Sequence, residues 1–190
     1  MILFQTVIGE DFDEMFQYDY YRYYGDEKVF KYKWPYELKY IYYLRKLQQG
    51  AKGIGAKYYS FCLNYLSKKT FIQIPYTTKI GKGFYIGHSG RVIINPNVVI
   101  GNNVNIATGI TIGRENRGNR KGTPVIGDNV WIGTNSVLVG NINIGDDVMI
   151  APLSFVNFDV PSHSIVLGNP GKIIPREGAT EGYISRPIKI

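Results

Sequence analysis

Residues 125–150 read VIGDNVWIGTNSVLVGNINIGDDVMI, and an aliphatic residue recurs in this stretch every six positions. Two earlier stretches keep the same spacing. The aliphatic residues of all three are Ile74, Ile80, Ile86, Ile94, Ile100, Ile106, Ile112, Ile126, Ile132, Leu138, Ile144, Ile150 and Val156. The next position is often glycine, as in Ile132-Gly133. A fixed short period of this kind indicates a solenoid built from repeated units.

Each six-residue unit can form one short strand and one corner, so three units close a triangular coil. The aliphatic residue points inward and stacks on its counterpart one coil away. Gly, Asn and Asp supply corner conformations with positive φ. We therefore predict a mainly β fold, a left-handed parallel β-helix over residues 71–174, preceded by a small α-helical region. The handedness rests on the repeat itself, because ordinary parallel crossovers are right-handed.

Residues 1–70 differ from the rest of the chain, because they contain 13 of the 16 tyrosines. Capping and breaking residues predict three helices, at Glu10–Tyr24, Pro35–Gln49 and Ile54–Lys68. We expect a helical cap packed on the first coil and on a neighbouring subunit, because Tyr buries a large ring and keeps a solvated hydroxyl. The alternative is a platform for an acceptor or for peripheral contact with a membrane surface, since basic residues interleave with the aromatic ones. Those basic residues are Lys28, Lys31, Lys33, Lys39, Arg45 and Lys46. An extended C-terminal tail is expected over residues 175–190.

The chain of 190 residues has a net charge of +7, which fits either a nucleic-acid partner or phosphate on a small cofactor. The sequence has no groove-reading or RNA-binding motif, so we expect no nucleic-acid partner. Cys62 is the only cysteine, which excludes an intrachain disulfide and suits a reducing compartment. The first residues do not resemble a signal peptide, and no apolar run is long enough to span a membrane. We therefore expect a cytoplasmic protein.

The six-residue period is interrupted at length once, between Ile112 and Ile126, and the extra residues predict a loop over residues 114–123. This loop contains four basic residues, one acidic residue and no apolar residue. Polar loops on a rigid scaffold often carry function, and the alternative is a solvated excursion without a role.

His88 is the candidate catalytic residue. It stands two positions after Ile86, and the repeat places Thr108, Thr134 and Pro152 in one outward column with it. We expect the polar loop to leave the coil beside this column. Imidazole can be neutral and basic near neutral pH, so His88 could take a proton from an acceptor hydroxyl that attacks a thioester. General-base help of this kind accelerates a reaction by about 10²–10⁴.

These residues resemble the hexapeptide-repeat acyltransferases, and most closely their serine acetyltransferase branch, over about residues 71–174. Gly87-His88-Ser89-Gly90 stands where that family has Asp-His-Ala-Thr-Gly, and Lys121-Gly122-Thr123-Pro124 where its loop ends Asp-Arg-His-Pro. Val160-Pro161-Ser162-His163 matches Val-Pro-Pro-His, and Gly168-Asn169-Pro170-Gly171-Lys172-Ile173 matches Gly-Val-Pro-Ala-Arg-Ile. The resemblance implies an enzyme that uses acetyl-CoA as acetyl donor and no metal, with His88 as general base. It also implies a homotrimer with its sites between subunits.

The resemblance assigns roles to further residues. Gln73 stands where the family has the carboxylate that orients the base. The backbone amides that hold the pantetheine arm fall on Arg114, Thr134 and Pro152. Because Pro152 has no N–H, we expect that contact to shift to Ala151. A backbone N–H near Gly113 or Arg114 could face the oxyanion. The expected contacts to CoA phosphates are Arg117, Arg120, Lys121 and Lys172, and the expected acceptor residues are Tyr85, Arg91 and Thr108.

The departures from the family pattern concern the acceptor. Charged residues that suit an amino acid are replaced by Gly87, Gly122 and Thr123, as in the serine acetyltransferase-like proteins of capsule and exopolysaccharide clusters. We therefore expect O-acetylation of a sugar or glycan-precursor hydroxyl in surface polysaccharide biosynthesis. The alternatives are acetylation of serine or another small molecule, and a non-catalytic β-helix scaffold. A β-helix metalloenzyme of the carbonic anhydrase type is disfavoured, because it needs three histidine ligands and the chain has only His88 and His163.

Overall fold

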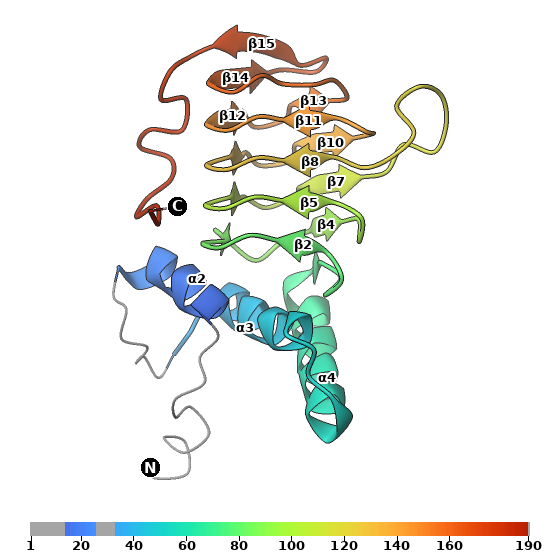
Figure 1. Ribbon diagram of the computed structural model, residues 1–190, viewed down its shortest axis with the longest axis vertical. Coiled ribbons are helices and arrows are strands. Elements are labelled where there is room, and N and C mark those ends of the chain that lie inside the picture. Colours follow the sequence, from blue (N-terminus) through green and yellow to red (C-terminus); the bar gives the residue numbers. More distant parts are fainter. Residues whose placement is uncertain (1–13, 26–32, 190) are drawn as a thin grey trace.

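The computed structural model describes residues 14–25 and 33–189. Three helices lie at one end of a column of short, stacked strands (Figure 1). They are α2 (Glu14–Tyr24), α3 (Tyr36–Gln48) and α4 (Gly53–Thr70). The start of the first expected helix, from Glu10, lies outside the described residues. No helix in the described ranges is long and apolar enough to cross a membrane.

The strands form three sheets, one along each side of a triangular coil. Sheet A has the order β1-β4-β7-β10-β13, sheet B the order β11-β8-β5-β2, and sheet C the order β15-β14-β12-β9-β6-β3. Their bounds are β1 Ile72–Gln73, β2 Lys79–Ile80, β3 Tyr85–Ile86, β4 Val92–Ile94, β5 Val99–Ile100, β6 Asn105–Ile106, β7 Thr111–Gly113, β8 Val125–Ile126, β9 Trp131–Ile132, β10 Val137–Val139, β11 Asn143–Ile144, β12 Val148–Ile150, β13 Phe155–Val156, β14 Ser164–Leu167 and β15 Lys172–Pro175.

The inward aliphatic residues stack in the register that the six-residue period predicts. In sheet C, Ile86 pairs with Ile106, Ile106 with Ile132, and Ile132 with Ile150. Each of these four side chains is at most 1% exposed, so the interior of the coil is a continuous aliphatic core. Neighbouring strands in all three sheets run parallel, except that β14 and β15 pair antiparallel at the end far from the helices. The predicted parallel β-helix is confirmed.

Glycine follows the aliphatic residues of sheet B for a reason other than the predicted need for a positive φ. Positive φ angles at this corner belong to Asn103, Asn129 and Asp147, and not to those glycines. At Gly101, an added Cβ would lie 2.6 Å from the carbonyl carbon of Gly127 in the next coil. Stacked backbones here approach too closely for a side chain, so packing rather than φ requires glycine.

A buried ion pair joins the helices to the first coil. Arg45 Nε lies 2.7 Å from Asp19 Oδ2, and the guanidinium also donates to the carbonyls of Ile80 and Gly81. Asp19 in turn accepts a hydrogen bond from the backbone N–H of Phe84. Arg45 is 3% exposed and fully engaged. The interleaved basic pattern had suggested that Arg45 could contact a membrane surface or an acceptor. Its burial in this ion pair makes it unavailable for either.

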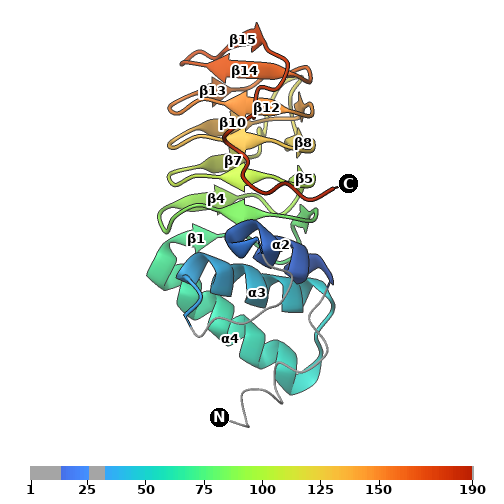
Figure 2. The ribbon, with the colours of Figure 1, turned by 90° about the vertical axis from the view of Figure 1, so that its left-hand side faces the viewer.

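The C-terminal residues run back along the coils toward the helices (Figure 2). The ring of Tyr183 packs at a tilt against Trp131 in sheet C, with centroids 5.0 Å apart. The carbonyl of Ser185 accepts a hydrogen bond from Arg22 in α2. Burial lowers the pKa of Arg22 to about 10. The tail that was expected to be merely extended is therefore a strap packed on sheet C and α2.

Candidate active site

Strand register in sheet C places His88 and three residues from higher coils in one column. Each stands two positions after an aliphatic residue of β3, β6, β9 or β12, and those four residues are paired in sequence. Thr108, Thr134 and Pro152 therefore follow His88 along the corner where sheet C leads into sheet A. This is the column that the repeat predicts.

The turn that carries His88 is held from below by a backbone hydrogen bond and lies close against Thr108 above it. Gly90 N–H donates to the carbonyl of Thr70 at the end of α4, at 2.8 Å. Gly90 has a φ of 146°, and an added Cβ would lie 2.9 Å from Cβ of Thr108 and overlap its hydroxyl oxygen. His88 itself is exposed, and its ring makes no hydrogen bond within the described ranges. The result is a free imidazole on a rigid corner.

Helices α2 and α3 hold the same turn. The Tyr23 hydroxyl donates to the carbonyl of Ile86 at 2.7 Å and accepts from its N–H at 3.2 Å. Burial raises the pKa of Tyr23 well above its usual value, so the hydroxyl keeps its proton. The Ser89 hydroxyl donates to the carboxylate of Glu37, which is 9% exposed. The buried carboxylate of Glu37 therefore binds the residue that directly follows His88 in the chain.

Sequence reasoning missed Glu37, Tyr23 and Ser89 as parts of the site. Glu37 is separated from Ser89 by 52 residues. Nothing in the repeat links an acid in the first turn of a helix to a corner of the solenoid. The only sequence signal was the position of Ser89 next to the candidate base, and it named no partner.

Gln73 lies on β1, where it pairs with Ile93 of β4 in sheet A. Its side chain is exposed, and no hydrogen bond joins its amide to the His88 ring among the described residues. Arg91 is also exposed, three positions after His88 at the start of the sheet A side. Within one chain, Gln73 therefore does not orient the imidazole as the resemblance implied.

Tyr85, one of the expected acceptor residues, lies on β3 just before the column, and a Cβ added at Gly87 would lie 3.8 Å from its ring. Tyr85 faces outward on sheet C, where the ring of Tyr23 stacks on it with centroids 4.4 Å apart. The Arg22 guanidinium lies 5.9 Å from the Tyr85 ring, so α2 partly covers this expected acceptor residue. Tyr76 lies elsewhere: with Thr78 it lines a recess of about 590 Å³ between the end of α3 and the first coil. That recess is at the corner between sheets A and B, not at His88.

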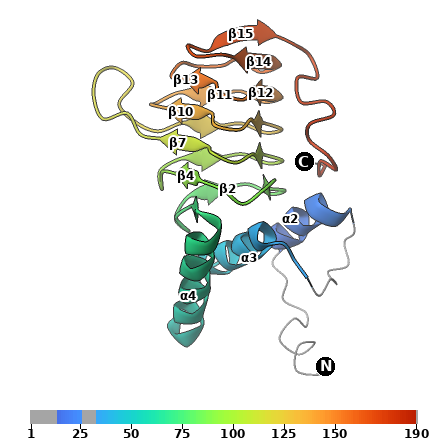
Figure 3. The ribbon, with the colours of Figure 1, turned by 180° about the vertical axis from the view of Figure 1, so that it is seen from behind.

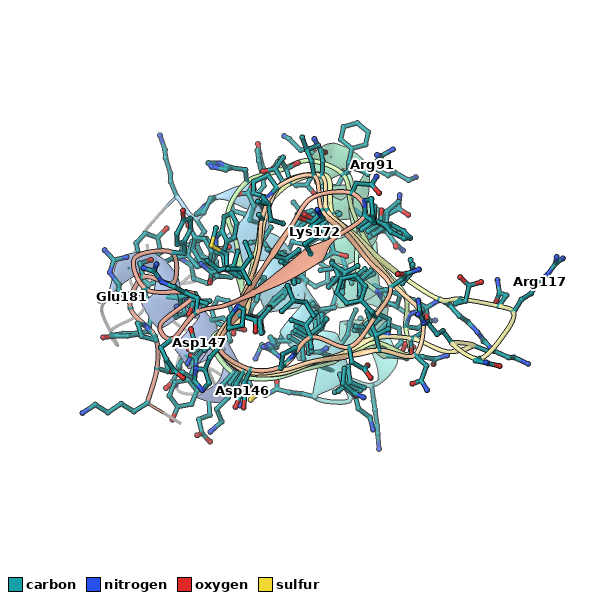
Figure 4. All side chains as sticks on the ribbon, turned by 90° about the horizontal axis from the view of Figure 1, so that it is seen from above. Arg91, Arg117, Asp146, Asp147, Lys172 and Glu181 are labelled. Carbon is teal, nitrogen blue, oxygen red and sulfur yellow. The ribbon has the colours of Figure 1, made fainter. Side chains whose placement is uncertain are left out.

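The polar loop also leaves from that other corner. It follows β7 of sheet A, whereas His88 follows β3 of sheet C. Figure 4 shows the three corners down the coil axis, marked by Arg91, by Asp146 and by Arg117 at the end of the loop. The expectation that the loop lies beside the His88 column is therefore wrong for a single chain. The two features lie at opposite ends of sheet A.

The base of the loop is ordered by hydrogen bonds. Glu115 and Gly122 exchange two backbone hydrogen bonds of 3.0 Å, and the carbonyl of Arg120 accepts from Asn141 on the next coil. The four basic side chains are exposed; they belong to Arg114, Arg117, Arg120 and Lys121. The loop thus presents positive charge on a fixed stem.

One expected cofactor contact is excluded by strand pairing. The N–H of Ala151 donates to the carbonyl of Val166 at 2.8 Å, so it cannot take over the contact that Pro152 lacks. Thr134 lies in the column one coil below Pro152. Gly113 ends β7 where the loop begins, and Lys172 is exposed on β15. These candidates are therefore divided between the two ends of sheet A.

The arrangement suits proton transfer by a side chain. An exposed imidazole on a rigid corner can accept a proton from an approaching hydroxyl. Within the described part of the chain, no group of three or more His, Cys, Asp and Glu side chains could hold a metal ion.

Comparisons with known proteins agree with this fold. The family model described as bacterial transferase hexapeptide (six repeats) matches residues 123–157. A serine acetyltransferase of Staphylococcus aureus is 41% identical over 113 residues, which cover 60% of this chain and 53% of the relative. Serine acetyltransferase 2 of Arabidopsis thaliana is 41% identical over 103 residues, covering 54% of this chain and 32% of the relative. The chain thus spans about half or less of the length of these curated relatives.

Solved structures extend the similarity to the helices. Serine acetyltransferase of Neisseria gonorrhoeae in complex with serine has a TM-score of 0.68 and 26% identity, covering 90% of this chain and 71% of that one. A serine acetyltransferase in complex with CoA has a TM-score of 0.63 and 25% identity, covering 74% and 58%. The chain is therefore a β-helix protein that is similar to hexapeptide-repeat transferases over residues 123–157 and to serine acetyltransferases in sequence and fold.

Proposed function

We propose that this hexapeptide-repeat protein is an acetyl-CoA-dependent O-acetyltransferase in which His88 is the general base. The observation that carries the proposal is the exposed His88 on a rigid corner of a fold shared with serine acetyltransferases. A solved relative holds CoA and another holds serine, which supports a thioester donor and a hydroxyl acceptor.

In the proposed reaction, His88 takes the proton from the acceptor hydroxyl while the hydroxyl oxygen attacks the thioester carbonyl carbon. The carbon–sulfur bond then breaks, and the CoA thiolate leaves with the proton that His88 had accepted. A backbone N–H at Gly113 or Arg114 is the proposed donor to the oxyanion. Arg117, Arg120 and Lys121 are proposed to attract the CoA phosphates. Because the loop and His88 lie at opposite ends of sheet A, the proposed site lies between copies of the chain, in a trimer.

Glu37 is proposed as a positioning residue for the base. Its carboxylate fixes Ser89 and with it the turn that carries His88. Gln73 makes no comparable contact in the described part of the chain, so the orienting role suggested for that residue passes to Glu37. Through the contact of Glu37 with Ser89, helix α3 would help to position the base that stands on the coils.

L-serine, or a small molecule of the same kind, is the acceptor that the relatives favour, since those described above are serine acetyltransferases. They do not support the polysaccharide acceptor that the departures in sequence suggested. One observation keeps a sugar hydroxyl as the second candidate. Gly87, Gly122 and Thr123 offer no charged side chain to an ammonium or a carboxylate.

The test is thiol release from acetyl-CoA by the full chain, with L-serine and a panel of free and nucleotide-linked sugars as acceptors. We expect serine-dependent release, and a loss of about 100-fold or more in kcat for His88→Ala with acetyl-CoA affinity unchanged. Faster turnover with a sugar would favour the second candidate. No release with any acceptor, or full activity of His88→Ala, would overturn the proposal.

A further inference from the structure

The outer face of α4 carries four large apolar side chains in contact with solvent. Ile54 is 87% exposed, Tyr58 56%, Phe61 71% and Tyr65 57%. Their spacing of four, three and four residues places them on one side of the helix. The opposite side holds Leu63 and Leu66, which are buried in the core. This helix therefore has two apolar faces, and only one of them is used inside the chain.

Positive charge borders the exposed face. Lys57 and Lys68 lie along one edge of the apolar stripe and Lys69 along the other, as helical spacing places them, and all three are exposed. The helix contains no Asp or Glu from residue 53 to residue 70. Lys69 Nζ lies 4.2 Å from the centre of the exposed Tyr36 ring. A hydrogen bond that Lys69 donates to the Tyr36 hydroxyl oxygen raises the pKa of Lys69, so this lysine stays charged.

The position of α4 leaves this face open to a large partner. The helix projects from the end of the molecule opposite β15 and points away from the coils (Figures 1 and 3). A broad surface could therefore reach α4 without meeting the solenoid. The column of His88 runs up the coils and away from this face.

The charge pattern distinguishes between two possible occupants. A second copy of the same face would bring three lysines against three lysines, with no acid on the helix to pair with them. An anionic lipid surface supplies negative charge and an apolar layer together. Tyr, Phe and Ile on a helix edged by lysines is the composition of helices that lie in the interfacial plane. Lysines near such a surface each add attraction to its negative potential.

We propose that the outer face of α4 docks on an anionic lipid membrane. Ile54, Tyr58, Phe61 and Tyr65 enter the headgroup region, while Lys57, Lys68 and Lys69 contact lipid phosphates. Such a contact would hold the protein at a membrane surface whatever its acceptor, so the inference does not depend on the proposed function.

The experiment is cosedimentation of the full chain with vesicles of phosphatidylcholine, alone or with part of it replaced by phosphatidylserine. We expect binding to the mixed vesicles, little binding to the neutral ones, and weakening by added salt. Ile54→Ser with Phe61→Ser should reduce binding about tenfold or more, and Lys57→Gln with Lys68→Gln by a similar factor. Leu167→Ser with Ile174→Ser is the matched control, because both residues are exposed and apolar at the far end of the coils.

Thermal melting of each variant shows whether it is folded. If the Ile54→Ser, Phe61→Ser variant does not fold, the Lys57→Gln, Lys68→Gln variant still tests the proposal. Equal binding to neutral and anionic vesicles, or no effect of either α4 variant, would overturn the proposal. The oligomeric state of the wild type and of the Ile54→Ser, Phe61→Ser variant, measured by sedimentation, tests whether a second copy of the chain occupies this face instead. Loss of an oligomer in the variant, without vesicle binding by the wild type, would assign the face to a second copy of the chain.

Discussion

At the scale of single residues, His88 depends on side chains that come from outside the solenoid. Tyr23 binds both backbone groups of Ile86, and Glu37 binds Ser89. Corners of a β-helix are short, so these two contacts hold the backbone of the turn from which the imidazole projects. The helices therefore contribute to the proposed site although they lie below the coils.

Removing the Glu37 contact should lower the rate without weakening cofactor binding. We expect Glu37→Ala and Ser89→Ala each to reduce kcat about 10- to 100-fold at unchanged acetyl-CoA KM, because a displaced base loses its alignment with the acceptor. Glu37→Gln keeps an acceptor oxygen and should recover most of the rate.

The double variant decides whether the two residues act together. If Glu37 works through Ser89, combining Glu37→Ala with Ser89→Ala should cost no more than the worse single change. Additive losses, or a loss of kcat that merely follows the melting temperature, would contradict the positioning role.

At the scale of elements, the corner of sheet B shows why the repeat tolerates so little change. The glycines there allow backbones of successive coils to stack directly. Gly101→Ala places a Cβ within 2.6 Å of backbone atoms of Gly127. We expect this substitution to destabilise the chain by about 2 kcal/mol or more, because neither backbone can move without breaking sheet pairing.

Gly55→Ala is the matched control for that prediction. Gly55 lies in α4, and only a ring carbon of Tyr59 lies within 4 Å of an added Cβ, at 3.9 Å. Alanine is the better helix former, so this change should stabilise by about 0.5 kcal/mol. Chemical denaturation of both variants measures the contrast, and a similar effect of the two substitutions would refute the packing explanation.

The loop over residues 114–123 is the second element that can be tested alone. Replacing Arg117, Arg120 and Lys121 with Gln should raise the KM for acetyl-CoA several-fold while leaving kcat nearly unchanged. The wild-type KM should also rise with salt, and the salt effect should shrink in the variant, because screening acts on the removed charges. Steady-state kinetics at two ionic strengths would show both effects. An unchanged KM would return the loop to a solvated excursion.

The repeat made the solenoid predictable from sequence, because each aliphatic residue reports one inward position and its register. The same spacing also predicted the column of His88, Thr108, Thr134 and Pro152. The loop was placed at the wrong corner, although Ile112 and Ile86 belong to different sides of the triangle and counting units would have separated them. The Glu37–Ser89 contact was beyond reach, because it depends on how the helices dock and no periodicity encodes that.

At the scale of the whole molecule, the strap formed by the C-terminal residues is held by a group that titrates. His163 Nδ1 lies 3.0 Å from Asp147 and 3.2 Å from Glu177. The hydrogen bond with Asp147 raises the pKa of His163. Asp147 also accepts from Ala179 and Thr180 of the strap. Partial burial raises the pKa of Asp147, but the hydrogen bonds from His163 and Thr180 lower it overall.

The directions of these shifts predict how the strap responds to pH. A raised histidine pKa stabilises the folded strap fully below the unfolded value of about 6.5, and this contribution is lost as pH rises through the folded pKa. The contribution of Asp147 is present above its unfolded value of about 3.9 and is lost on acidification. The protection of the amides of residues 179–188, measured as the exchange rate relative to the intrinsic rate at each pH, should therefore fall as pH rises above about 6.5. His163→Gln should remove this dependence, and an unchanged profile in that variant would exclude His163 as its origin.

The separation of the loop from His88 leads to a prediction about assembly. If each site combines the His88 corner of one subunit with the loop of the next, three sites close in a cyclic trimer. Exposed apolar residues lie on or beside sheet A, as such contacts require, at Phe71, Ile93 and Leu153. Sedimentation should then give a trimer, and a stable monomer at micromolar concentration would exclude the shared site.

Complementation between two defective chains tests the shared site directly. His88→Ala lacks the base but keeps the loop, and the chain with Gln at positions 117, 120 and 121 keeps the base but binds acetyl-CoA weakly. In trimers co-expressed from equal amounts, a site needs its base from one kind of chain and its loop from the other. Random mixing gives this combination at roughly one site in four. At low acetyl-CoA, about a quarter of the sites should therefore work at the wild-type rate, and the mixture should clearly exceed the average of the two variants. If base and loop act within one chain, no mixture can restore a site. The activity would then stay at the average of the two variants. This outcome would show that the loop of one subunit does not serve the His88 of another.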